Sequence, residues 1–141
     1  MPRHLSWFVI AVVLWAVASP IAGQDGATKT LVGTWRLVSA KYGGQKSTLP
    51  NDATTLKYFT PTHYVWMSYT KNGKVARMAG GPYSFNGKTL EDTPQFGVGD
   101  AFDLVRAKHQ TFECKVEGKT LYQSGKLSSG LSLEEVWELV E

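Results

Sequence analysis

The sequence predicts an all-β domain, built as an antiparallel sandwich or barrel, on three observations. Short runs rich in β-branched and aromatic residues alternate between apolar and polar side chains, as strands with one buried face do. Hairpin signals separate these runs, among them Asn72-Gly73 and Asn86-Gly87. No convincing helix follows the apolar N-terminal stretch. About nine or ten strand candidates at such short spacing are typical of a sandwich or a barrel.

The N-terminal stretch has the pattern of a secretory signal. Arg3 and His4 precede an apolar run over 5–17, and small residues follow it. The run is shorter than the ~20 residues that span a bilayer as a helix, which favours cleavage over the alternative of an uncleaved anchor. We therefore expect a cleaved signal peptide over 1–23, export to the periplasm or the outside of the cell, and no stable membrane insertion afterwards.

What remains is the size of one domain. Residues 24–30 are polar and Gly-containing, which indicates a flexible lead-in, and 31–141 form the predicted β-domain with one core. The net charge of the chain is +3 and its basic residues form no block, which argues against nucleic-acid binding. Cys114 is the only cysteine, so the exported domain has no internal disulfide and depends on its core for stability.

Each expected strand is bounded by a turn or loop signal. The first covers 31–41, and the segment 42–53 after it contains Gly, Pro and Asn-Asp, which is typical of a loop. A second loop is expected over 94–100. The remaining strands are expected over 54–60, 63–70, 74–85, 89–93, 102–107, 110–116, 119–127 and 131–140.

The first strand carries a short motif, Gly33-Thr34-Trp35. A Gly two residues before a Trp in an opening strand resembles the lipocalin and calycin group. The resemblance implies a single up-and-down antiparallel barrel of about 8–10 strands, in which Gly33 permits a close approach of the chain and Trp35 closes one end. It also implies a ligand held inside the barrel. The last strand departs from the lipocalin pattern, because 131–140 contains no basic residue to pack over the opening Trp.

The last two hairpins predict which side chains face the interior. A three-residue turn over 128–130 places Gln123 opposite Glu135 and Leu121 opposite Trp137. A two-residue turn at 117–118 adds Cys114 to the same face, as a buried and unreactive thiol. The opposite face is polar, so this face is interpreted as the interior. A helix over 133–139 is the alternative, because its Glu and Leu residues favour helices, but the period-two spacing of its apolar residues favours a strand.

The hairpin at Asn72-Gly73 permits two registers. A three-residue turn over 71–73 puts Arg77 on a mostly apolar face with Val65, Met67, Tyr69, Val75 and Ala79, and with His63 further along. A two-residue turn instead groups Arg77 with Tyr64, Trp66 and Ser68. The apolar count favours the first register. Since a buried Glu135 needs a partner, Arg77 is its candidate.

Polar side chains on an apolar interior face have two interpretations. One is a ligand site, mostly apolar with a few placed polar groups, that holds a small apolar or amphiphilic molecule. The other is an internal Arg–Glu pair in a filled barrel that acts as a structural or interaction module. For the first interpretation, the candidate ligand-binding residues are Arg77, Glu135, Gln123, His63, Trp66, Tyr69 and Trp137.

Enzymatic interpretations have less support. His63 and His109 lack the spacing of a zinc site, and Cys114 lies in no nucleophile motif. We therefore expect no catalytic residue, no metal and no cofactor. The remaining alternative is a haem-binding or enzymatic barrel, with His63 as the axial haem ligand. The oligomeric state stays open.

Overall fold

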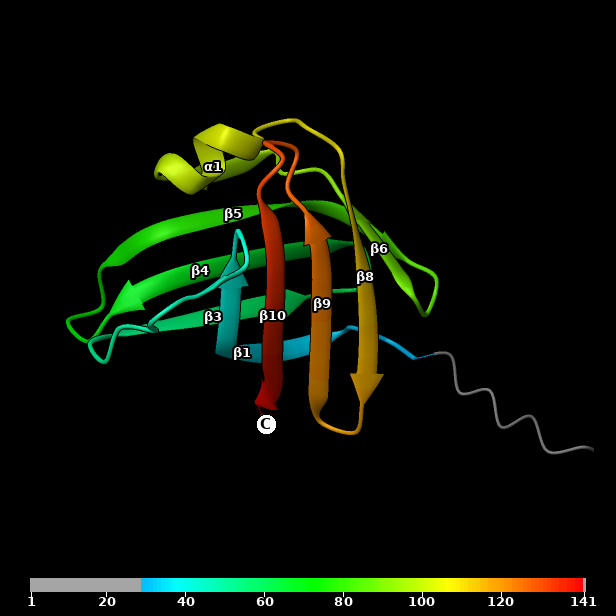
Figure 1. Ribbon diagram of the computed structural model, residues 1–141, viewed down its shortest axis with the longest axis horizontal. Coiled ribbons are helices and arrows are strands. Elements are labelled where there is room, and N and C mark those ends of the chain that lie inside the picture. The colour runs from blue at the N-terminus through cyan, green and yellow to red at the C-terminus, as the bar shows by residue number, and fades with distance from the viewer. Residues whose placement is uncertain (1–28, 141) are drawn as a thin grey trace, which may run out of the picture.

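The computed structural model describes residues 29–140, which form a β-barrel with one short helix (Figure 1). The elements are β1 (Gly33–Tyr42), β2 (Gln45–Lys46), β3 (Ala53–Phe59), β4 (His63–Thr70), β5 (Val75–Phe85), β6 (Thr89–Asp92), β7 (Phe96–Val98), α1 (Asp100–Val105), β8 (Gln110–Glu117), β9 (Thr120–Lys126) and β10 (Ser132–Val140). The predicted signal peptide over 1–23 and most of the lead-in over 24–30 lie outside the described residues. Within 29–140, no helix has the length and hydropathy needed to cross a bilayer.

The barrel is closed and runs up and down. Its wall consists of β1, β3, β4, β5, β6, β8, β9 and β10, each antiparallel to the next. The last strand returns to the first, and their pairing extends from Thr34 opposite Val140 to Tyr42 opposite Leu133. The predicted all-β, lipocalin-like barrel is therefore confirmed, and β10 is a strand as expected. β2 and β7 are additional short strands that pair with β1 and β5.

The interior face predicted for the last hairpins is confirmed residue by residue. Gln123 pairs with Glu135 and Leu121 with Trp137. Cys114 pairs with Gln123, and its side chain is buried in the core. The turn residues of these hairpins fix the register, and register alone decides which alternate side chains point inward.

Gly33 and Trp35 lie where the first strand meets the last. A Cβ atom at Gly33 would stand 2.9 Å from Cδ1 of Leu139, and the φ of 143° at Gly33 is one that residues with a side chain rarely adopt, so this position favours glycine. Trp35 is buried in the core cluster, and its indole nitrogen donates a hydrogen bond to the carbonyl of Leu31 at 2.8 Å.

The register favoured for the β4–β5 hairpin is wrong. Its three-residue loop is present, since the Thr70 N–H donates to the carbonyl of Lys74 at 2.9 Å. A bulge follows, however, and Arg77 pairs with Ser68 rather than with Met67. The extra residue in the bulge moves Arg77 onto the other face of the strand. The interior face of β4 is therefore the alternative set of Tyr64, Trp66 and Ser68.

The segment 93–109 differs most from expectation. A strand was predicted over 102–107, but α1 occupies this place, and β7 lies within the predicted loop over 94–100. Phe102 and Val105 are buried while Leu104 is exposed, which is the three-residue spacing of a short helix with one buried side. In the sequence, the apolar residues at 102 and 104 have the alternation of a strand. The packing of α1 on β5 and β7 shows that this segment is a helix instead.

Segment 93–109 folds back over one end of the barrel. The Ala107 N–H donates to the carbonyl of Pro94 at 2.7 Å and so closes the segment at its base. Gly97 pairs with Ala79 on β5, and Phe102 of α1 packs directly over Gly97. We call this end of the barrel the α1 end.

Candidate functional site

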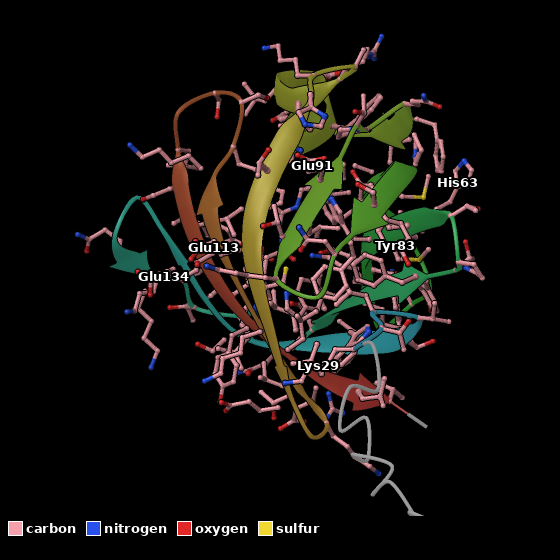
Figure 2. All side chains as sticks on the ribbon, turned by 90° about the vertical axis from the view of Figure 1, so that its right-hand side faces the viewer. Lys29, His63, Tyr83, Glu91, Glu113 and Glu134 are labelled. Carbon is pink, nitrogen blue, oxygen red and sulfur yellow. The ribbon has the colours of Figure 1, made fainter. Side chains whose placement is uncertain are left out.

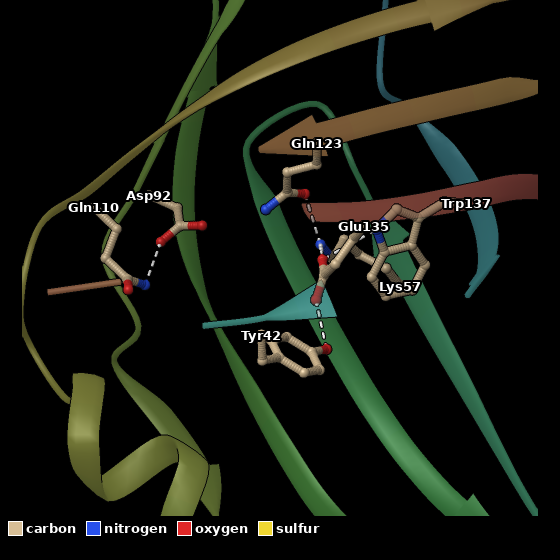
Figure 3. Close-up of polar contacts among 7 residues, drawn as sticks. All are labelled: Tyr42, Lys57, Asp92, Gln110, Gln123, Glu135 and Trp137. Atoms are coloured by element: carbon tan, nitrogen blue, oxygen red, sulfur yellow. Dashed lines mark hydrogen bonds and ion pairs between the residues drawn. The ribbon is translucent and has the colours of Figure 1, made fainter. Parts of the chain in front are cut away.

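A buried lysine lies at the centre of the barrel. Lys57 on β3 shares the inner face with Phe59, because alternate residues of a strand point the same way. Its side chain is 5% exposed. The ammonium donates to Oε1 of Gln123 at 2.8 Å, lies 3.6 Å from Oε2 of Glu135, and stands 4.1 Å from the centre of the Trp137 ring (Figure 3).

Glu135 is the anion of this group. Its Oε1 accepts a hydrogen bond from the Tyr42 hydroxyl at 2.9 Å, and its Oε2 accepts one from the Trp137 indole at 3.1 Å. Burial, and then the neighbouring Glu135 charge, raise the pKa of Tyr42, so its hydroxyl stays protonated and remains a donor. Lys57, Gln123, Glu135, Tyr42 and Trp137 thus form one connected group, named here the lysine cluster.

A second carboxylate lies on the same inner wall. Asp92 ends β6, and its Oδ1 accepts a hydrogen bond from Nε2 of Gln110 at 3.1 Å. The Tyr64 hydroxyl is also hydrogen-bonded to Asp92. Burial raises the pKa of Asp92 to about 6, against the opposing effects of the Lys57 charge and of these two hydrogen bonds. Figure 3 shows the Asp92–Gln110 pair on the side of the barrel away from Glu135.

These polar groups satisfy one another. Within 29–140, no buried side-chain nitrogen or oxygen lacks a hydrogen-bond partner. Buried polar groups that are fully paired hold their side chains in one arrangement. The site therefore presents a fixed array of charges inside an otherwise apolar core.

Three of the predicted site residues lie together on the inner wall, as the sequence predicts. Glu135, Gln123 and Trp137 all belong to the lysine cluster. Trp66 also faces the interior, where it packs against the core cluster. The last hairpins predicted the inward positions of Glu135, Gln123 and Trp137, whereas Trp66 faces inward only because the β4–β5 register differs from the favoured one.

Arg77 is not the partner of Glu135, which is a correction of the sequence prediction. Lys57 fills that place from β3. Because of the β4–β5 bulge, Arg77 shares the inner face with Ser68 at the α1 end, and its side chain is exposed. Its positive charge still acts on Tyr42 and opposes the rise of the pKa of that hydroxyl. The Arg77 side chain makes no hydrogen bond or ion pair with any residue in the range 29–140.

His63 and Tyr69 lie outside the barrel. Both alternate with the inward residues of β4 and so occupy its outer face. Figure 2 shows His63 at the periphery of the molecule, where its Nδ1 pairs with the Thr62 hydroxyl at 2.9 Å. Among the described residues, no group of three or more His, Cys, Asp or Glu side chains could hold a metal ion.

The site residues that the sequence reasoning missed include Lys57 and Tyr42 of the lysine cluster, and Asp92 with its partner Gln110. The run 54–60 is followed by Pro61 and by no Asn-Gly or similar turn signal, so the sequence did not fix which face of this strand points inward. The placement of Phe59 as a core residue would have been the one usable signal, because Lys57 is two residues away on the same face.

The two ends of the barrel differ in burial. Trp35, Phe59 and Leu121 are buried at the end away from α1. At the α1 end, Tyr42 and Trp66 are only half-buried. The surface has a depression of ≈ 340 Å³ beside β8 and β9 and another of ≈ 90 Å³ beside β1 and β3. None of the side chains drawn in Figure 3 lines either depression.

The comparisons with known proteins agree on the fold. No protein-family model and no curated protein matches the sequence. A lipocalin-like protein from Bacteroides uniformis superposes with a TM-score of 0.56 at 15% identity, over 78% of this chain and 98% of that chain. The chain has a lipocalin-like fold. An uncharacterized protein from Bacteroides eggerthii gives a TM-score of 0.57 at 13% identity, over 77% of this chain and 98% of that chain.

A third solved structure is more distant from this lipocalin-like barrel. It is the tryptamine complex of the amine binding protein of Rhodnius prolixus, with a TM-score of 0.44 and 16% identity, over 76% of this chain and 62% of that chain. At such identities the similarity of the lipocalin-like barrel to the two Bacteroides structures concerns the fold alone, and its function must be argued from its own side chains.

Proposed function

We propose that this lipocalin-like barrel binds a small, partly apolar ligand inside its α1 end. The observation that carries the proposal is the buried Lys57–Glu135 pair on the inner wall. Removing two charges from water costs several kcal/mol per ion, and apolar residues of similar volume are often as stable or more stable. A fold that needed only a filled core gains nothing from such a pair, so the pair supports a role in ligand recognition.

The α1 end supplies both parts of an amphiphile site. Trp66 and Tyr42 offer half-buried aromatic surface. The Thr55 and Ser68 hydroxyls form a hydrogen bond with each other at 2.6 Å on the inner wall nearby. Arg77, on the same inner face, has its guanidinium unengaged by residues 29–140 and can grip an acidic head group with two parallel hydrogen bonds.

The test is a binding experiment on the freshly purified protein. Native mass spectrometry and solvent extraction reveal a co-purified molecule, and titration with fatty acids and with a neutral apolar dye measures affinity. We expect saturable binding of both, and Arg77→Met should weaken fatty-acid binding about 10- to 150-fold while dye binding is retained, since a charge-assisted hydrogen bond contributes ~1.5–3 kcal/mol.

Arg36→Met is the matched control, because Arg36 lies on the barrel exterior and pairs with Glu138. It should leave both affinities unchanged. If no molecule co-purifies and neither probe saturates, ligand binding is contradicted.

A second candidate function is a structural or interaction module with a filled barrel. It is favoured by the complete mutual pairing of the buried polar atoms within the described chain. In that case, substitutions in the lysine cluster change the free energy of unfolding, and no probe binds with or without them.

We further propose that the protein is exported. The support is the apolar run over 5–17 with its basic start and small-residue end. Expression of the full chain, followed by cell fractionation and N-terminal sequencing, should give an exported product that begins near residue 24. A product that keeps Met1 in the cytosolic fraction would contradict export.

A further inference from the structure

The depression of ≈ 340 Å³ beside β8 and β9 lies where one edge of β8 is uncovered. β6 begins at Thr89, which pairs with Glu113, so among the described strands none follows the rest of β8 along this edge. We name this place the outer depression, and its volume is within the ~300–1,000 Å³ of typical small-molecule sites. No residue of the lysine cluster lines it. Its lining includes Lys29, Lys88, Glu113, Lys115, Val116 and Tyr122.

Backbone groups at the uncovered edge point into the outer depression. The Cys114 N–H donates to the carbonyl of Lys88 at 2.7 Å. Because the N–H and C=O groups of a strand alternate between its two edges, the N–H and C=O of Val116 point the same way. The Val116 carbonyl accepts a hydrogen bond from the Lys29 ammonium at 2.8 Å. The Val116 N–H meets no strand among residues 29–140, so it remains a donor beside a fixed positive charge.

Positive charge dominates the lining of the outer depression. Lys29, Lys88 and Lys115 contribute three ammonium groups, and Glu113 contributes one carboxylate. Lys115 forms an ion pair with Glu117, whereas the Lys88 side chain makes no hydrogen bond or ion pair with residues 29–140. Three ammonium groups against one carboxylate leave a net charge of +2 in the lining. A phosphate monoester carries about −1.5 to −2 at neutral pH and has three acceptor oxygens, so it matches both the charge and the donors.

An exposed aromatic ring adjoins these charges. Tyr122 on β9 pairs with Lys115 on β8, so their outward side chains are neighbours. The Tyr122 side chain is 43% exposed, and Ser124 next to it adds a hydroxyl to the lining. A flat ring attached to a phosphate group can therefore lie against Tyr122 while the phosphate reaches the lysines.

We propose that the outer depression binds a small phosphate monoester that carries a flat ring. The phosphate oxygens accept hydrogen bonds from Lys29, Lys88 and the Val116 N–H, and the ring lies on Tyr122. Figure 2 shows Lys29 beside the lower part of β8, where this site lies. The site is on the outside of the wall, so it does not depend on a ligand inside the α1 end.

The experiment is a titration with phenyl phosphate. The full chain is expressed, and amide NMR shifts of the purified product are followed as phenyl phosphate is added. We expect saturable shifts around 87–88, 114–116 and 122–124, with a Kd below ~1 mM, and weaker binding of inorganic phosphate, which lacks the ring. Added salt should weaken binding, because the three lysines are exposed.

Two lysine variants test the position of the site. Lys88→Met should weaken phenyl phosphate binding about five- to tenfold, and Lys88→Gln repeats the test if Met lowers solubility. Lys71→Met is the matched control, because Lys71 is also exposed in a hairpin turn but lies between β4 and β5. It should leave the affinity unchanged.

Two further variants test the chemistry of the site. Glu113→Gln should strengthen binding about two- to fivefold, because it removes a carboxylate from the lining. Tyr122→Ser should weaken binding of phenyl phosphate about two- to tenfold and leave that of inorganic phosphate unchanged.

The proposal is overturned if phenyl phosphate gives no saturable shifts up to about 10 mM. It is equally overturned if the shifts map to the α1 end, if Lys71→Met weakens binding as much as Lys88→Met, or if only vesicles that contain phosphatidic acid bind. Equal affinities for phenyl phosphate and inorganic phosphate, both unchanged by Tyr122→Ser, would overturn the role of the ring.

Discussion

At the scale of single residues, the buried charges are expected to affect stability most. Lys57 is held by one amide, one carboxylate and one aromatic ring, all on β9 and β10, while Lys57 itself lies on β3. The contacts run over β1, which pairs with both β3 and β10, so they tie strands together that are far apart in the chain. Such contacts stabilise only while both charges are present, because a single buried charge without a partner is strongly unfavourable.

Removal of the Lys57 charge should therefore be costly. We expect Lys57→Met to lower the free energy of unfolding by ~3–5 kcal/mol, since Glu135 then keeps a buried charge without its cation. Lys57→Met combined with Glu135→Gln should recover much of this loss. Urea unfolding followed by Trp fluorescence measures both.

Arg36→Met supplies the comparison for an exposed pair. It breaks the Arg36–Glu138 ion pair, whose side chains are more than half exposed, and should cost less than ~1 kcal/mol. Equal losses for the two single variants would contradict the assignment of Lys57–Glu135 as a buried pair.

Asp92 should make stability depend on pH. Burial raises its pKa to about 6 in the folded chain from an ordinary value of 3.8. As pH rises from about 4 to about 6, the unfolded chain loses this proton while the folded chain retains it, so the free energy of unfolding falls, by roughly 1–3 kcal/mol. Asp92→Asn should remove this fall, measured by urea unfolding at pH 4, 5, 6 and 7.

The groups that face Asp92 are Tyr64, Gln110, Lys57 and His109. Glu91→Gln, on the same strand but exposed, is the control and should keep the wild-type pH dependence. If Asp92→Asn also keeps the wild-type pH dependence, the raised pKa of Asp92 is not the cause of that dependence.

At the scale of elements, glycines set how segment 93–109 packs on β5. A Cβ atom at Gly81 would stand 2.1 Å from the carbonyl oxygen of Thr93, and one at Gly97 would stand 2.2 Å from that of Met78. Both contacts are with backbone, which cannot move aside as a side chain does. The close approach of the segment to β5 therefore depends on these two residues.

Gly81→Ala should displace segment 93–109. We expect a loss of roughly 1–3 kcal/mol from the packing conflict, together with faster amide exchange in α1 and β7 than in β9 and β10. Hydrogen exchange followed by mass spectrometry measures the local effect. Gly73→Ala, in a turn where a Cβ atom meets nothing within 4 Å, should cost only the ~1 kcal/mol of its left-handed backbone and leave α1 unchanged.

At the scale of the whole molecule, the barrel is held by strand closure and core packing without a disulfide. Cys114 is the only cysteine of the chain and is buried on the inner wall. Burial raises the pKa of its thiol to about 12, so the reactive thiolate is scarce at neutral pH.

Thermal stability should therefore be independent of reductant. The Tm should be the same with and without a thiol reductant, and Cys114 should react with a chromogenic disulfide reagent only as fast as the chain unfolds. A Tm that falls on reduction would indicate a disulfide between two chains, and rapid labelling of the native protein would contradict the burial of the thiol.

The sequence by itself determined the features that depend on local order. Turn residues and alternation were enough for the strands outside segment 93–109, for the faces of β8, β9 and β10, and for the pairing of Gln123 with Glu135. These strands are joined by short turns and have a polar outer face, so the register and the burial pattern point to the same answer.

Only the tertiary structure decided the partner of Glu135, the bulge that places Arg77 on the other face of β5, and the helix in segment 93–109. A bulge adds one residue without a signal in composition, and the outer face of β4 is as apolar as its inner face, so an apolar count could not separate them. Lys57 meets Glu135 because the barrel closes through the pairing of β10 with β1, which brings β10 next to the strand that also pairs with β3. Such contacts join residues far apart in the chain, and no local pattern contains them.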